Sequence, residues 1–231
     1  AREAMAGAGL DALLVWKDEN VRYLTSLRPQ LIAGKSGLLN GALLTHEEVV
    51  LFASGGDVDR ARLSMPWISE FYAIPILEEA GLVRYFVDRV LRPVLQARRL
   101  LRARVGVDLA SFALHEALRE HLPEVRWADG DVVMHQARRV KLPEEVALME
   151  EAVAMAEAVT HAALQAIRPG VREVEVAGEA MRTLYGLGGE YAHVTTPFVA
   201  SGERMSPPVR LSTDKLIRHG DLVFVDIGCM W

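Results

Sequence analysis

Short apolar runs alternate with helical patterns through the first 130 residues, and this alternation most constrains the fold. Runs of this kind, rich in β-branched and aromatic residues, predict buried strands, and the segments between them carry helix caps and helical spacing. Together they are typical of an α/β domain. Two neighbouring runs separated only by His46-Glu47-Glu48 predict a β-hairpin. The predicted strands are 12–16, 42–45, 49–52, 71–76, 105–107 and 125–127.

The pattern changes near residues 138–143, where we place a domain boundary. Pro143 suits the first position of a helix, and two glutamates follow it in the first turn, at the positive end of the helix dipole. Apolar residues then recur at steps of three and four up to Ile167, which predicts an amphipathic helix. A second predicted helix starts at Glu173, and extended segments follow it. We therefore predict one domain over residues 1–138 and part of an α+β domain over residues 139–231.

A single carboxylate, Asp226, follows directly on the apolar run from Leu222 to Val225. The run predicts a buried strand, and burial of an ionised carboxylate costs several kcal/mol unless a cation or strong donors meet it. Gly228 then allows a turn or a close backbone approach. These residues leave two interpretations open. Asp226 either caps a turn at an ordinary strand end, or it is a metal-binding or catalytic carboxylate.

Composition narrows the classes of partner. The net charge of −5 and the isoelectric point of about 5.8 argue against nucleic acid and anionic membranes. No apolar run approaches the roughly 18 residues that a membrane span needs. Cys229 is the only cysteine, which excludes an internal disulfide and makes the cytoplasm the expected location. The sequence lacks an initiator Met and stops at the apolar Trp231, so we expect it to be part of a longer polypeptide.

Short catalytic motifs add little. Gly34-Lys35-Ser36 looks like the end of a phosphate-binding loop, but Pro29 stands where that motif needs a glycine. The sequence contains no HExxH or HxH pair and no nucleophile elbow. A histidine that belongs to no such motif is more often structural than catalytic. We keep His193 as a catalytic candidate, because it lies before a predicted strand in the half where we expect the site.

Several further segments form an ordered set that is more specific than any one of them. In the first half they are Gly9 to Val15, Asn20 to Thr25 and Val105 to Asp108. In the second half they are Arg139 to Lys141, Glu144 to Met149, Ile167 to Gly170, Glu173 to Ala177, Val199 to Arg204, Thr213-Asp214 and Gly220 to Gly228. The set resembles the creatinase, prolidase and aminopeptidase P family, and the resemblance covers essentially the whole chain.

The resemblance implies a fold and a cofactor. The fold is an α/β N-terminal domain of the creatinase type, which is ribonuclease-H-like, followed by the first part of an α+β pita-bread domain. Metal-dependent members hold two divalent ions (Mn²⁺, Zn²⁺ or Co²⁺) with two aspartates, a histidine and two glutamates. Asp226 matches the first aspartate, and the other four ligands would lie beyond Trp231. We therefore expect residues 1–231 alone to bind divalent metal poorly and to lack peptidase activity.

The resemblance leaves three functions open. The first is a metal-dependent hydrolase resembling Xaa-Pro dipeptidases and aminopeptidases, which would cleave a peptide bond or another C–N bond. The second is a metal-free, creatinase-like amidinohydrolase acting on a small molecule, and the third is a non-catalytic binding module. Many peptidase members carry a substrate-contacting histidine where this chain has Val209. The neighbouring Arg210 can bind a carboxylate, which makes it a second catalytic candidate, but it is no equivalent proton donor or acceptor.

The resemblance also implies a homodimer. In some family members the N-terminal domain of one subunit reaches the active site of the other. Residues 26–40 hold proline, glycines and polar residues, which predicts a loop. Its cations Arg28 and Lys35 are our candidates for that contact with a small peptide or another small C–N substrate.

Overall fold

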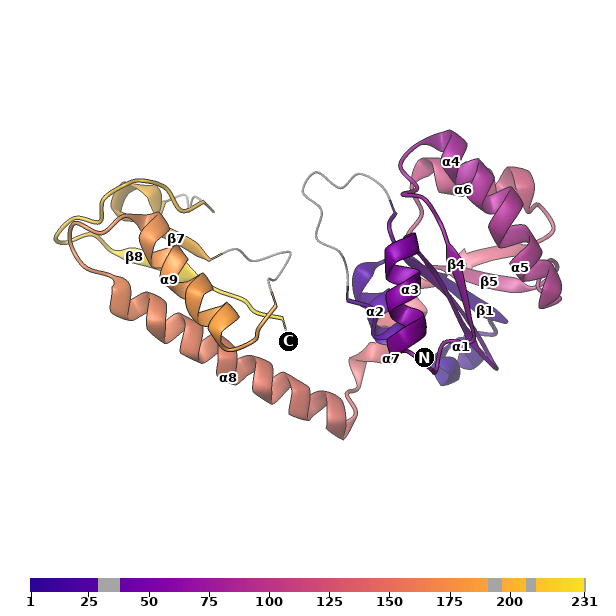
Figure 1. Cartoon of the computed structure of the whole chain (residues 1–231), viewed down its shortest axis with the longest axis horizontal. Coiled ribbons are helices and arrows are strands. Elements are labelled where there is room, and N and C mark those ends of the chain that lie inside the picture. Colours follow the sequence, from indigo (N-terminus) through magenta and orange to yellow (C-terminus); the bar gives the residue numbers. More distant parts are fainter. Residues whose placement is uncertain (29–37, 191–196, 207–210, 231) are drawn as a thin grey trace. The chain divides into compact units, whose positions relative to one another are not determined.

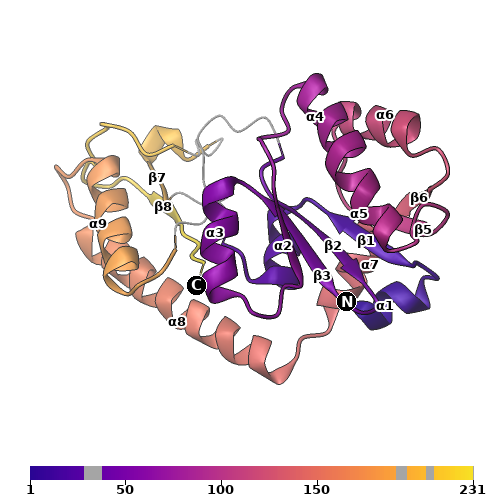
Figure 2. The same cartoon turned by 45° about the vertical axis from the view of Figure 1, so that its right-hand side comes forward.

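The computed structural model describes residues 1–28, 38–190, 197–206 and 211–230. The chain divides into two compact units, unit 1 (Ala1–Val140) and unit 2 (Lys141–Trp231) (Figures 1 and 2). Unit 1 has an α/β architecture and unit 2 combines helices with a β-ribbon, as the sequence predicts. Within these described ranges, no helix is both long enough and apolar enough to cross a membrane.

Unit 1 is built on a mixed sheet whose six described strands lie in the order β4-β3-β2-β1-β5-β6. Strands β2 and β3 are antiparallel neighbours, which confirms the predicted hairpin. Strands β1, β5 and β6 run parallel, so their carboxyl ends meet at one edge of the sheet. The strands are β1 (Ala12–Val15), β2 (Gly41–Thr45), β3 (Val49–Ala53), β4 (Glu70–Ala73), β5 (Arg104–Val107) and β6 (Arg126–Asp129).

Helices cover both faces of this sheet (Figure 2), because successive side chains of a strand point to opposite faces. In β1, Leu14 packs into one apolar cluster, whereas Leu13 and Val15 pack into another on the opposite face. The first cluster includes side chains of α4 to α6, and the second includes side chains of α1, α2, α3 and α7. The helices are α1 (Arg2–Gly7), α2 (Asp18–Thr25), α3 (Gly55–Ser64), α4 (Ala80–Phe86), α5 (Arg92–Ala97), α6 (Phe112–His121) and α7 (Asp131–Arg139).

The sequence pattern predicts one long helix from residue 77 to about residue 101, kinked or divided near Pro93. The structure confirms a continuous helical run that is irregular next to Pro93, although it is shorter than predicted: α4, a π-helical turn at Val87–Leu91, and α5 follow one another without a break. Pro93 lies in the first turn of α5. Proline has no N–H for the bond to the preceding turn, so the regular helical ladder cannot run through this position.

Asp108 ties the end of β5 to the chain that leaves β1. Its Oδ1 accepts a hydrogen bond from the N–H of Trp16 at 2.7 Å. Its Oδ2 accepts from the N–H of Lys17 at 3.1 Å and from the side-chain amide of Asn20 at 2.7 Å. Burial raises the pKa of this carboxyl above its ordinary value, although the three donors act against the rise. The contact holds the carboxyl ends of two parallel strands together.

Unit 2 packs two helices against one β-ribbon. Helix α8 (Pro143–Ala166) begins at Pro143, as predicted, and lies beside α9 (Glu173–Gly186) (Figure 1). Strands β7 (Phe198–Ser201) and β8 (Val223–Asp226) are antiparallel, and a short 3-10 turn, η2 (Gly202–Arg204), follows β7. The buried apolar side chains of this unit are Val159, Ala163, Val176, Ala180, Leu184, Val199 and Ile217.

We expect Asp108→Ala to lower the free energy of unfolding of unit 1 by about 3 kcal/mol, because three donors around the removed carboxylate lose their acceptor. Asp59→Ala is the matched control, since the Asp59 side chain is 79% exposed and forms a long ion pair with Arg62 at 3.9 Å. Urea unfolding followed by circular dichroism measures both variants. Equal stabilities of the two variants would contradict the role given to Asp108.

Candidate functional site

The β7–β8 ribbon carries the carboxylate that the sequence singles out. Asp226 is the last residue of β8 and pairs in register with Phe198, the first residue of β7. Side chains alternate along the strand, so Val223 and Val225 pack against the helical core of unit 2. Asp226 therefore lies on the other face of the ribbon, away from that core, and its side chain is exposed.

The prediction of a fully buried strand before Asp226 is wrong. Residues Val223 to Val225 are each partly exposed, because helices α8 and α9 pack on one face of the ribbon alone. An apolar run shows that a strand is hydrophobic but does not show how many of its faces are covered. In the described part of the chain, no side chain pairs with Asp226. Its carboxylate is thus open to a cation or to solvent.

A second carboxylate, Glu173, is fully buried at the first position of α9. Its Oε1 accepts from the N–H and the hydroxyl of Ser201, at 2.8 and 2.9 Å. Its Oε2 accepts from the N–H and the hydroxyl of Thr213, at 3.1 and 2.8 Å, and from Nε of Arg204 at 3.2 Å. Five donors from three segments thus converge on one buried anion.

Burial by itself would raise the pKa of Glu173, but the donors outweigh it. Hydrogen bonds from the hydroxyls and N–H groups of Thr213 and Ser201 hold the pKa of this carboxyl below its ordinary value. Glu173 is therefore ionised at neutral pH, and the position at the N-terminal end of α9 adds a favourable dipole.

A neighbouring ion pair extends the network towards β8. Lys215 Nζ donates to the hydroxyl of Ser201 at 2.8 Å and to Oδ2 of Asp221 at 2.7 Å. Asp221 also accepts from the N–H of Arg218 at 2.9 Å, and both contacts lower its pKa. Gly202 has a φ of +54°, and a Cβ there would lie 2.6 Å from Asp221 Oδ1. Only glycine suits this position, and the network fixes the segment that enters β8.

Of the other site residues that the sequence analysis singled out, the structure places Arg28 alone. Arg28 lies in unit 1, after α2, with an exposed side chain. Lys35, His193, Val209 and Arg210 lie outside the described residues. The single cysteine is half-buried, and its thiol donates to the carbonyl of Ala152 at 3.0 Å. Burial raises the pKa of Cys229, which disfavours the reactive thiolate.

Sequence reasoning missed Glu173 as a key residue. An acid in the first turn of a helix is common on protein surfaces, where it favours the helix dipole. Its donors lie 28 to 40 residues further along the chain, so no local pattern reveals them. The one available signal was that Glu173, Ser201 and Thr213 all fall in segments of the ordered set that resembles the family.

The described residues do not make a metal centre by themselves. Among them, no group of three or more His, Cys, Asp and Glu side chains is placed to hold a metal ion. Asp226 offers carboxylate oxygens, which suit Mn²⁺, Zn²⁺ and Co²⁺, but a two-metal site needs several such ligands.

We expect Glu173→Gln to lower the free energy of unfolding of unit 2 by about 3 kcal/mol at pH 7, because an amide cannot accept all five hydrogen bonds. The folded pKa lies below the unfolded value of about 4.3, so the stabilisation is complete above that pH. It is lost as the pH falls through the folded pKa. Thermal unfolding at pH 7 and in acid should therefore show a difference between the two proteins that shrinks in acid.

The control is Glu179→Gln on the same helix. Glu179 pairs with Arg182 at the surface, so a much smaller change is expected at every pH. A Glu173→Gln difference that is the same at pH 7 and in acid would show that the buried charge is not responsible.

The sequence and the fold were compared with known proteins. Residues 1–140 match the model of the creatinase/prolidase N-terminal domain, and residues 147–231 match that of metallopeptidase family M24. An uncharacterized peptidase of Bacillus subtilis, YqhT, is 26% identical over all of this chain and 60% of its own length. The Xaa-Pro dipeptidase of Pyrococcus horikoshii is 26% identical over 99% of this chain and 58% of its own. The ectoine hydrolase of Halomonas elongata is 22% identical over 98% and 59%.

Solved structures give the same picture of the fold. The X-Pro aminopeptidase of Thermotoga maritima superposes with a TM-score of 0.77 at 21% identity, over 99% of this chain and 60% of that one. The chain thus spans about 60% of the length of the relatives that it matches. Its first unit is an α/β creatinase-type domain, and its second is the start of a pita-bread domain. The chain belongs to the creatinase and prolidase family.

Proposed function

We propose that the protein is a hydrolase of the Xaa-Pro peptidase type, cleaving a peptide bond next to proline. The observation that carries this proposal is the alignment of almost the whole chain with an Xaa-Pro dipeptidase, together with the match of residues 147–231 to a metallopeptidase family. Asp226 supports it from the structure, because its carboxylate stands exposed on the ribbon face away from the helical core.

Asp226 is in this proposal one ligand of a pair of divalent ions. The remaining ligands have to come from outside the described residues, since these contain no metal-binding group of three. The Glu173 network serves as the support of that ligand. It fixes β7 and the segment before β8, and so it sets where the end of β8 lies.

A second candidate function is hydrolysis of a C–N bond in a small molecule. The observation that favours it is the similarity of the chain to an ectoine hydrolase over 98% of its length. Val209, in place of the histidine that many peptidases carry, agrees with a substrate other than a Xaa-Pro peptide. A metal-free, creatinase-like reaction belongs to the same class.

The proposed setting is a homodimer in the cytoplasm. The lone cysteine agrees with a reducing compartment. Arg28 and Lys35 would contact substrate at the active site of the partner subunit, where their positive charges suit a peptide carboxylate.

The first test uses the protein expressed from its complete reading frame, freed of metal by a chelator. We expect Mn²⁺, Zn²⁺ or Co²⁺ to restore hydrolysis of Xaa-Pro peptides. Asp226→Asn should lower kcat/KM at least about 100-fold, because loss of a ligand removes several kcal/mol of transition-state stabilisation. Asp214→Asn is the control, since its side chain is 86% exposed, and it should leave activity unchanged.

The outcomes separate the candidates. Hydrolysis of ectoine without hydrolysis of Xaa-Pro peptides would favour the second function. Unchanged activity of Asp226→Asn would remove Asp226 from the site. The polypeptide of residues 1–231 alone should bind these metals weakly, as measured by calorimetry, whereas tight stoichiometric binding would mean that the ligand set is already present.

A second test concerns the contact between subunits. Replacing Arg28 and Lys35 together by alanine should raise KM and leave kcat nearly unchanged, because the two charges bind substrate but take no part in bond cleavage. The control replaces Arg62 and Arg89, two exposed arginines of the same unit, by alanine. Steady-state kinetics on the metal-loaded protein decides, and an equal KM for both double variants would rule the contact out.

A further inference from the structure

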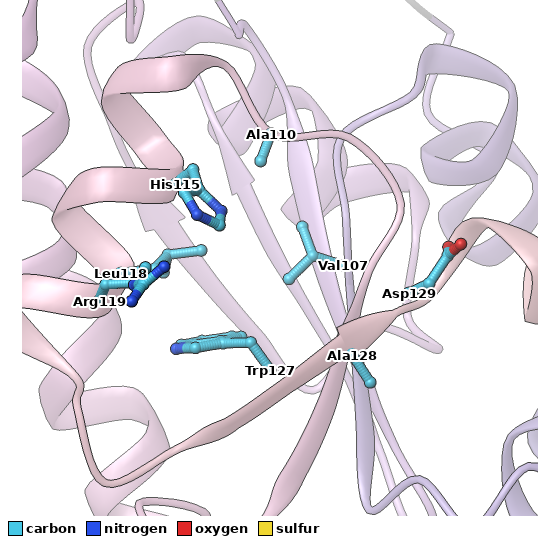
Figure 3. Close-up of a pocket in the computed structure, with 8 residues that line it drawn as sticks. All are labelled: Val107, Ala110, His115, Leu118, Arg119, Trp127, Ala128 and Asp129. Atoms are coloured by element: carbon cyan, nitrogen blue, oxygen red, sulfur yellow. The ribbon is translucent and has the colours of Figure 1, made fainter.

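Unit 1 contains a pocket that is lined by none of the residues proposed for the peptidase site. It has a volume of about 460 Å³ and lies between α6 and the β5–β6 edge of the sheet (Figure 3). Val107 and Asp129, the last residues of β5 and β6, both line it. Open α/β sheets bind ligands at the carboxyl ends of their parallel strands, and small-molecule pockets commonly have this volume.

The floor of the pocket is apolar. Val107 and the Trp127 ring come from the strands, and the buried side chain of Leu118 comes from α6. All three belong to the apolar cluster on this face of the sheet, so their positions are fixed by packing. A ligand that covers this floor needs an apolar body of its own.

The helix wall of the pocket carries a guanidinium group and an imidazole ring. His115 and Arg119 are four residues apart on α6, so they lie on the same face of the helix, and Figure 3 shows both on that side of the pocket. Two arginines near α6 are paired, Arg84 with Glu120 and Arg92 with Glu124. Within the described ranges, by contrast, no acidic group pairs with Arg119. Its guanidinium is therefore available to an anion.

The indole N–H of Trp127 is a second observation, independent of Arg119, that points to a bound acceptor. Its indole Nε1 is buried and has no hydrogen-bond partner among the residues that the structure describes. A buried N–H without an acceptor carries a free-energy penalty that a bound acceptor would remove. In Figure 3 the indole nitrogen lies at the end of the ring that faces Arg119. The Arg119 side chain is exposed, so it can change rotamer and admit a ligand oxygen to this donor.

The pocket has no matching place for a positive charge. Asp129 is its one acidic lining residue, and its carboxylate caps the start of α7. Oδ1 of Asp129 accepts from the N–H of Asp131 at 2.9 Å and from that of Val132 at 3.4 Å. Figure 3 shows the Asp129 carboxylate beyond the end of β6, apart from Trp127, His115 and Arg119. The charge pattern therefore suits an anion better than an amine or a zwitterion.

We propose that this pocket binds a small monocarboxylate with an apolar body. The carboxylate pairs with Arg119, with His115 beside it, and one of its oxygens accepts the hydrogen bond of Trp127 Nε1. The apolar body lies on Val107, Leu118 and the Trp127 ring. The pocket is formed by unit 1 alone, whereas Asp226 belongs to unit 2, and the proposal does not depend on the proposed hydrolase activity.

The test is a titration of the ¹⁵N-labelled protein with 3-phenylpropanoate, followed by the indole N–H signals in two-dimensional NMR. Trp127→Phe assigns the Trp127 signal. We expect a saturable downfield shift of this signal, because its N–H gains a charged acceptor. The Trp67 signal is the internal control, since its Nε1 already donates to the carbonyl of Thr25 at 3.1 Å and should not move. The uncharged 3-phenylpropanamide and inorganic phosphate serve as comparison ligands.

Matched variants complete the test. Arg119→Gln should raise the Kd for 3-phenylpropanoate about tenfold, the loss expected for one charge-assisted contact. Arg126→Gln removes the same charge from β6, next to Trp127 but on an exposed side chain that does not line the pocket, and should leave the Kd unchanged. An unmoved Trp67 signal shows that each variant is folded. The absence of a saturable shift, equal binding of the amide or of phosphate, or equal effects of the two variants would each overturn the proposal.

Discussion

The burial of one charge, on Glu173, shapes most of unit 2. An ionised carboxylate is stable in a protein interior only where donors replace the water it loses. Here those donors come from the end of β7, from the turn that follows it and from the segment around Thr213. Satisfying the charge therefore brings together parts of the chain that are 28 to 40 residues apart. These contacts help to hold in place the ribbon that presents Asp226.

Unit 1 also contains a buried carboxylate that joins separate segments, with fewer donors around it. Asp108 closes the parallel strands β1 and β5 by accepting hydrogen bonds from two backbone N–H groups and from Asn20. In both units a buried acid at the end of an element acts as a fixed point for loops, which leaves the strand ends in set positions. In unit 1 the pocket beside Trp127 lies at such a strand end, and in unit 2 the Asp226 carboxylate does. Functional groups can then be carried by loops without losing their geometry.

Much of the fold could be predicted from the sequence, because the spacing of apolar residues and the residues that begin or end helices and strands are local features. The alternation of strands and helices, the hairpin around residues 46–48 and the start of α8 at Pro143 follow from patterns within a few residues. In the candidate site, the local strand pattern singled out Asp226 but left its role open, and the resemblance alone favoured a metal ligand over a turn cap. The open face of β8 depends on where α8 and α9 pack, and the role of Glu173 depends on distant donors. No local sequence pattern predicts either of these two features.

The buried carboxyls of Glu173 and Asp108 have pKa values displaced in opposite directions, so their contributions to stability change with pH in opposite senses. Glu173 stabilises unit 2 only while it is ionised, so its stabilising contribution is lost as the pH falls through its folded pKa. Asp108 has a raised pKa, so burying its charge weakens unit 1 at neutral pH, and protonation in acid relieves that penalty. Protonation of these two residues in acid therefore removes a stabilising contribution from unit 2 and a destabilising one from unit 1.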